Sequence, residues 1–305
     1  MKRYHLMFLI LALAMFLNAC NPTTKKDQST DRNSSTTKVS YFGQTPPGMT
    51  AEVFAPGLVS VNGRYEYAVT FSKELDELYF SGNKKGGHSR TYFSKLNDGK
   101  WTQPTMVNFT NGKRSSEFQT FIDPKGDRIY YAADGPGNAK IWQSSRVENS
   151  WNEAKELKLP INDDIVFFPN MANNGDLFYT NLSKRKVYYA PNKSGKYPEV
   201  KEVGIAYGFH GFISPDQDFI LVDARKENDK TKDKDIHVCF KKKDGTWTTH
   251  INLGPAVNSD FAETCPSLTP DGKYLLFSRY NEEGGLSNIY WISAEVINKV
   301  RPIDL

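Results

Sequence analysis

Three glutamates, Glu66, Glu117 and Glu263, occupy the same position in a segment that recurs along the chain, six residues before its central residue. Carboxylates held close together raise one another's pKa unless a cation or a hydrogen-bond donor lies between them. Such a set could hold a cation through oxygen ligands, or supply the acid and base of glycosidic bond cleavage. Alternatively, each carboxylate could accept hydrogen bonds from backbone N–H groups of the neighbouring repeat. Val166 and Gly208 in the two other copies favour this structural interpretation.

A second set of side chains could form a binding surface. His210 lies four residues before the centre of its copy, so strand alternation places it on the side that the glutamates share. Arg225 and Arg279 follow the second strands of their copies, where loops are expected to surround one mouth of a channel. Together with Tyr67 and Tyr280 they could form a polar and aromatic floor for a sugar or a peptide.

Other chemical signals are missing from the sequence. No spacing of His, Cys and Asp resembles a zinc site, no serine stands in a Gly-x-Ser-x-Gly setting, and no glycine-rich phosphate loop precedes a helix. We therefore expect no metal and no cofactor. Cys239 and Cys265 fall on an outer-half strand of one repeat and an inner strand of the next, so we expect two buried thiols rather than a disulfide.

The recurring segment that must position these residues has the pattern strand, tight turn, strand. In its clearest copy, Pro270 presets φ, Asp271 and Gly272 suit the next two turn positions, and Tyr274 begins an apolar run rich in aromatic residues. Weaker copies cover 70–80, 121–131, 170–179 and 212–221. The central residues, spaced by 51, 49, 42 and 55 positions, are Ser72, Asp123, Ala172, Ser214 and Thr269.

Each copy continues with a third strand, beginning near residues 91, 140, 186, 235 and 288. In four copies a turn and an outer strand opened by an aromatic residue follow, at Trp101, Trp151, Tyr197 and Trp247. The fifth copy instead continues into a helical pattern over 293–300, and segment 51–55 could supply its missing outer strand.

About four strands in each period of this length are typical of a β-propeller. We predict an all-β chain of five four-stranded blades, closed by an N-terminal strand and followed by a short C-terminal helix. The alternatives are an open solenoid of hairpins and a β-sandwich, and the regular third and outer strands argue against both.

The turns of the Ser/Thr-Pro-Asp-Gly kind, followed by Leu-Tyr-Phe-Ser and Ile-Tyr-Trp, resemble the TolB-type, WD-like propeller repeats of bacterial envelope proteins over about residues 50–300. The last copy matches best, while the third departs from the pattern with Asn173-Asn174-Gly175. The resemblance implies a propeller that serves as a binding module in many members and as an enzyme in some. A shared fold does not by itself fix function.

The N-terminus has the pattern of an export signal. Lys2 and Arg3 precede an apolar run over 6–17, which is too short to span a bilayer comfortably. The run ends in Leu17-Asn18-Ala19-Cys20, which resembles the lipobox of bacterial lipoproteins; an ordinary secretory signal is the alternative. We expect a signal peptide over 1–19, a tether without fixed structure over 20–45 that carries acyl chains such as palmitate on Cys20, and the propeller over 46–305.

These features lead to three hypotheses about function. The first is a lipid-anchored, monomeric binding module for an envelope protein or a glycan, placed at the outer membrane by analogy with enterobacterial sorting, since Asn21 follows the cysteine. The second is a carbohydrate-active enzyme, of hydrolase or lyase type, that uses the three glutamates. The third is a purely structural envelope component. The net charge of +4, of which Lys2 and Arg3 supply two units, is too small to indicate nucleic-acid binding.

Overall fold

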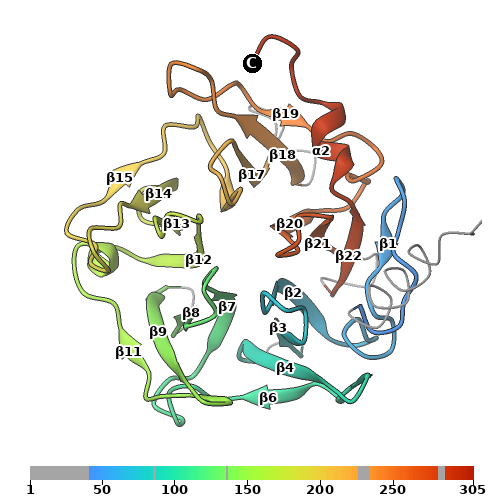
Figure 1. The fold of residues 1–305 in the computed structure, drawn as a ribbon, viewed down its shortest axis with the longest axis vertical. Coiled ribbons are helices and arrows are strands. Elements are labelled where there is room, and N and C mark those ends of the chain that lie inside the picture. The colour runs from blue at the N-terminus through green and yellow to red at the C-terminus, as the bar shows by residue number, and fades with distance from the viewer. Residues whose placement is uncertain (1–40, 85–86, 135–136, 226–233, 281–285) are drawn as a thin grey trace, which may run out of the picture.

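The computed structural model describes residues 41–84, 87–134, 137–225, 234–280 and 286–305, and the description below concerns these residues. The strands form five antiparallel blades arranged in a ring (Figure 1), with the first strand of each blade nearest the centre. This confirms the predicted all-β propeller. No helix among the described residues is long and apolar enough to cross a membrane.

The blades follow one another along the chain. Their strands are β2 (Tyr65–Phe71), β3 (Glu77–Asn83), β4 (Arg90–Asn97) and β6 (Thr105–Val107) in blade 1; β7 (Glu117–Ile122), β8 (Arg128–Ala133), β9 (Lys140–Val147) and β11 (Lys155–Glu156) in blade 2; β12 (Val166–Met171), β13 (Leu177–Asn181), β14 (Lys186–Ala190) and β15 (Lys201–Glu202) in blade 3; β16 (Phe209–Ile213), β17 (Phe219–Ala224), β18 (Asp235–Phe240) and β19 (Ile251–Asn252) in blade 4; and β20 (Glu263–Leu268), β21 (Tyr274–Tyr280), β22 (Ser287–Ser293) and β1 (Glu52–Val53) in blade 5. A one-turn 3₁₀ helix, η1 (Ile161–Asp163), precedes blade 3, and α2 (Glu295–Lys299) follows blade 5 as predicted.

The N-terminal strand closes the ring, as the sequence predicts. Glu52 pairs with Trp291 and Val53 with Tyr290, so β1 is the outer strand of the blade built from the last residues. Tyr41, which lies within the segment expected as the tether, is fully buried and packs on Trp291. The expected signal peptide and Cys20 lie outside the described residues.

In four of the five repeats, Ala172 being the exception, the side chain of the central residue accepts hydrogen bonds from the turn between the first two strands. The Oγ of Ser72 accepts hydrogen bonds from the backbone N–H groups of Asp76 and Glu77, and Ser214 does the same four and five residues further on. Three residues after the centre, the backbone is left-handed in all five blades, and three copies place glycine there, including Gly272. The sequence pattern of the repeat therefore reflects two local requirements of one turn.

A β-bulge interrupts every first strand at the same place. The residue four positions before the repeat centre has a positive φ, and the pairing with the second strand shifts beside it. These residues are Ala68, Gln119, Phe168, His210 and Cys265. A bulge turns its side chain away from the regular alternation of the strand, so period-2 reasoning does not fix where these five side chains point.

The aromatic residues expected to open the outer strands lie elsewhere. Trp101 and Trp151 end short two-residue hairpin strands, β5 (Lys100–Trp101) and β10 (Ser150–Trp151), and the outer strands begin four residues later. Trp151 donates a hydrogen bond from Nε1 to the hydroxyl of Tyr79 in the preceding blade. The N-terminal segment takes the place of a preceding blade for Trp101, which stacks on Phe42 at 4.2 Å between ring centroids. Trp151 therefore joins two neighbouring blades, and Trp101 joins blade 1 to the N-terminal segment.

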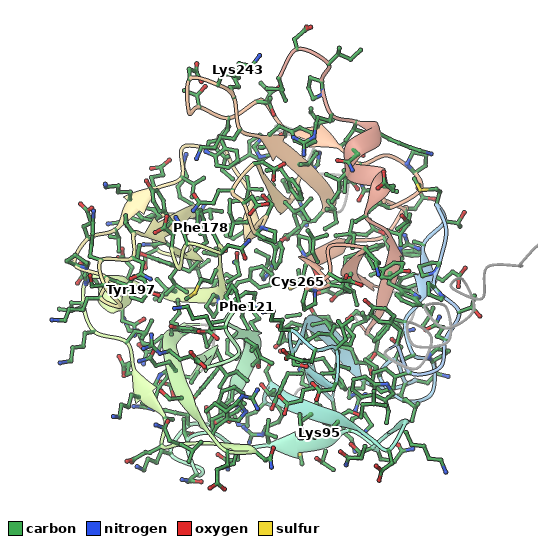
Figure 2. All side chains as sticks on the ribbon, viewed as in Figure 1. Lys95, Phe121, Phe178, Tyr197, Lys243 and Cys265 are labelled. Atoms are coloured by element: carbon green, nitrogen blue, oxygen red, sulfur yellow. The ribbon has the colours of Figure 1, made fainter. Side chains whose placement is uncertain are left out.

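The hydrophobic core lies between successive blades, each pair of neighbours enclosing apolar side chains from both sheets. A further cluster combines apolar side chains of blades 4 and 5 with channel-facing residues of every blade, including Phe118, Phe168 and Cys265. Figure 2 shows Cys265 and Phe121 near the centre of the ring. Side chains thus fill the middle of the channel among the described residues, and a cavity lies at each of its two mouths.

Candidate functional site

The carboxylates of the three repeated glutamates accept hydrogen bonds from other groups of the chain, and we call each glutamate with its donors a staple. Glu117 is buried, and its Oε2 accepts the N–H of Phe109 at 2.8 Å, while Oε1 accepts the N–H of Thr110 at 2.8 Å and its hydroxyl at 2.5 Å. Glu263 is held in the same way by the N–H and hydroxyl of Ser259. The donors come from the segment that enters the glutamate's own first strand, rather than from a strand of the neighbouring blade.

Arginine completes two of these staples. Arg64 donates from Nε to Glu66 at 2.8 Å, and Arg279 donates from Nε to Glu263 at 2.7 Å. Each guanidinium also donates from Nη2 to a valine carbonyl and covers a tyrosine ring, at Tyr92 and Tyr290. Arg279 is therefore part of a staple and does not form the predicted binding floor with Tyr280.

Glu66 is the least satisfied of the three. Burial raises its pKa to about 7, although Arg64 and the N–H of Val61 oppose this shift. Its Oε2 is buried and accepts no hydrogen bond from any described residue. None of the three glutamates lines either mouth of the channel, and the described residues contain no group of three or more metal-ligating side chains. The three carboxylates are thus enclosed by their own blades and do not line either mouth among the described residues.

The channel opens into a cavity at the end where the first strands begin, which we call the wide mouth. The cavity measures about 290 Å³ and receives side chains from all five blades. Its wall combines aromatic rings with neutral polar groups, namely Tyr65, Tyr67, Phe118, Phe167, Asn83, Ser89, Ser116 and Gln119, together with His210 and Cys265. A smaller cavity of about 160 Å³ lies at the opposite end, among the turns of the five repeats.

Tyrosine hydroxyls are arranged along one side of the wide mouth. The hydroxyls of Tyr65 and Tyr280 lie 2.7 Å apart, and the hydroxyl of Tyr67 donates to Ser89 at 2.7 Å. Burial raises the pKa of all three tyrosines, so they remain neutral at physiological pH. The structure therefore brings Tyr67 and His210 to the wide mouth, and Tyr280 lies beside it through its contact with Tyr65. Arg225 instead lies exposed just beyond the end of β17.

His210 belongs to a buried charge cluster behind this wall. Its Nδ1 lies 2.6 Å from Oδ1 of Asp223, and Nζ of Lys234 lies 2.9 Å from Oδ2 of the same carboxylate. Burial favours the neutral imidazole, but the charge of Asp223 outweighs this effect and raises the pKa of His210 to about 10. Burial also opposes ionisation of Asp223, yet His210 and Lys234 hold its pKa at about 2. The cluster is therefore an imidazolium and an ammonium sharing one carboxylate.

Sequence reasoning missed Asp223 and Lys234, which no short motif connects with His210. One signal was available: Asp223 interrupts the apolar run of β17 and is fully buried, and a buried carboxylate requires a partner. Cys239 and Cys265 are both buried, free thiols, as expected, and Cys265 interacts with the ring of His210 inside the wide mouth.

Comparisons with known proteins bear on the fold alone. No protein-family model matches the sequence, and no curated protein matches it. Among solved structures, a TolB-type protein from Agrobacterium tumefaciens superposes with a TM-score of 0.50 at 13% identity, covering 75% of this chain and 77% of that one. TolB from Acinetobacter baumannii gives a TM-score of 0.48 at 14% identity, and the match covers 74% of this chain and 53%, about half, of that protein. The chain thus shares the TolB-type propeller fold.

Proposed function

We propose that this chain, with its TolB-type propeller fold, is an exported lipoprotein, anchored to the outer membrane through acyl chains on Cys20. In this proposal the propeller is a monomeric, non-catalytic binding module for an envelope protein or a glycan. The wide mouth carries the proposal, because blades 1 to 3 contribute aromatic rings and neutral hydrogen-bonding groups to one cavity, to which blade 4 adds His210 and blade 5 adds Cys265. Such a mixture is typical of sites that bind small molecules or one group of a larger partner.

The staples support binding rather than catalysis. A general acid or base must reach the substrate, and the glutamates of the repeat are enclosed by their own blades. Their carboxylates are instead engaged by donors such as Thr110, Ser259 and Arg64. This arrangement supports the binding module over the alternative of a carbohydrate-active enzyme that uses these glutamates.

The test compares two variants of the full chain in binding to envelope glycan fragments and to envelope proteins crosslinked in cells. Tyr67→Ala alters the wide mouth, whereas Tyr188→Ala changes a partly buried tyrosine of β14 that lines neither mouth. We expect only Tyr67→Ala to lose the partner. Equal binding by both variants, or turnover of a glycan by the wild type, would contradict the proposal. In a detergent phase-separation assay, the wild type should enter the detergent phase. Movement of the Cys20→Ser variant to the aqueous phase would separately support the lipid anchor.

A further inference from the structure

The charge cluster at the wide mouth gives this cavity a preference for anionic ligands. This inference rests on the proposed binding function. Asp223 contributes −1, and His210 and Lys234 contribute +1 each, so the three side chains carry a net charge of +1. The Asp223 side chain is fully buried, and its two oxygens are each bound to one of the cations. These three side chains therefore carry one positive charge in excess, and Cys265 lies beside His210.

His210 presents that charge to the cavity. Among the described residues that line the wide mouth, His210 alone is charged at neutral pH, and its side chain is 15% exposed. Because Nδ1 is engaged by Asp223, Nε2 is the other nitrogen that can donate, and the ring also forms a hydrogen bond with Cys265, which lines the same cavity. A thiol is a weak acceptor, whereas a carboxylate oxygen forms a strong, charge-assisted bond with an imidazolium.

The backbone conformation at His210 fixes the orientation of its imidazole ring. His210 occupies the bulge position of blade 4 with a φ of 44°, where the other blades carry Ala68, Gln119, Phe168 and Cys265. The ring is further packed between Phe167 and Phe168, at 5.4 and 5.0 Å between centroids. A rigid cation beside aromatic rings binds an anion without first being ordered, which lowers the entropic cost of binding.

We propose that the wide mouth binds the carboxylate of a small acid, with Nε2 of His210 as donor and the aromatic wall of Tyr65, Tyr67 and Phe167 against the body of the ligand. A uronic acid sugar and an aromatic carboxylic acid share this chemistry. A cavity of about 290 Å³ is near the lower end of the range for small-molecule sites, which suits a single ring.

The experiment is isothermal titration of the full wild-type chain with four probes at low salt: glucuronate against glucose, and benzoate against benzyl alcohol. We expect at least one acid to bind about tenfold more tightly than its neutral partner, the difference that one charge-assisted hydrogen bond supplies. The acid that binds more tightly then shows whether the ligand is a sugar acid or an aromatic acid. Equal binding of acid and neutral probe would overturn the charge preference while leaving the binding module intact. Binding of none of the probes would also overturn it, and the separate partner assay would still decide the proposed function.

Single substitutions test whether the preference for the acid arises from the charge cluster of His210, Asp223 and Lys234. His210→Gln and Lys234→Gln should each reduce the advantage of the acid about tenfold, whereas Lys100→Gln, which removes the charge of an exposed lysine that lines neither mouth, should preserve it. Melting temperatures show whether each variant remains folded, and the wild-type comparison stands even if one does not. An undiminished advantage in a folded His210→Gln would refute the assignment.

A pH series gives an independent readout. The ionisable groups around His210 are Asp223, Lys234 and Cys265, with Tyr280 next to them. Because the pKa of His210 is raised to about 10, the preference for the acid should stay constant between pH 6 and pH 8.5. Loss of that preference between pH 6 and pH 8, the behaviour of an ordinary histidine, would contradict the proposal.

Discussion

Replacing Glu117 and Glu66 separately by glutamine tests whether the repeated glutamates are staples. Both substitutions conserve shape, and both residues occupy the same position of the repeat. Glu117 uses both carboxylate oxygens, since Oε2 accepts from Phe109 and Oε1 from Thr110. In Glu66 only Oε1 accepts hydrogen bonds from described residues. The two variants therefore differ in how many bonds an amide must break.

The magnitudes follow from this count. In Glu117→Gln the amide nitrogen must face a backbone N–H, and leaving a buried donor unpaired costs about 1–3 kcal/mol. The bonds that remain lose charge assistance, at about 1 kcal/mol each, while the relief of burying a neutral group offsets part of the sum. We expect a net loss of about 3 kcal/mol in the free energy of unfolding. In Glu66→Gln the amide nitrogen can replace the unpaired Oε2, so we expect a loss below about 1 kcal/mol.

The assay is urea unfolding of the full chain, followed by tryptophan fluorescence. With a slope of about 3 kcal/mol per molar urea, the loss in Glu117→Gln corresponds to a midpoint about 1 M lower. Glu66→Gln should unfold close to the wild type. Equal losses in the two variants, or a stable Glu117→Gln, would refute the argument that the bonding of each carboxylate decides its contribution.

Three further predictions follow from the structure. Because the pKa of Glu66 is raised from 4.5 to about 7 on folding, its contribution favours the folded state below pH 4.5 and is lost as the pH rises through 7; the unfolding free energy of the wild type should therefore fall relative to that of Glu66→Gln between pH 4.5 and pH 7.5. A Cβ on Gly211 would lie 2.7 Å from both methyl groups of Val187, so Gly211→Ala should cost about 2 kcal/mol in thermal unfolding, whereas Gly48→Ala, which meets nothing within 4 Å, should be neutral. Tyr41→Phe should cost about 1 kcal/mol and Tyr41→Ala about 4 kcal/mol in the same assay, because the ring is fully buried and the hydroxyl makes one hydrogen bond.

The fold was predictable because the residues of each repeat meet the conformational requirements of its own turn. Ser72 and Ser214 cap a turn, and Gly272 supplies a left-handed backbone, so each copy shows its strand–turn–strand pattern without reference to the others. The pairing of β1 with β22 was also predictable, since the fifth copy lacked an outer strand that segment 51–55 could supply.

The candidate site was only partly predictable. Tyr67 and His210 line the wide mouth, but the role of Arg279 depends on which face of β21 meets Glu263. The bulge that orients His210 leaves no mark in residue type, because the five bulge residues range from alanine to phenylalanine. Asp223 and Lys234 reach His210 through tertiary structure alone, which a local pattern does not contain.

The closure of the ring has a consequence for the order of folding. Tyr41 and Asp271 are joined by a hydrogen bond across 230 residues, and the first strand of the chain pairs with the last. During synthesis, four blades can in principle assemble from residues that are already available, but the fifth must wait until β22 has been made. Until then β1 presents an unpaired strand edge that could pair with another chain. A single copy thus becomes protected from intermolecular strand pairing at this seam only when its C-terminal residues are complete.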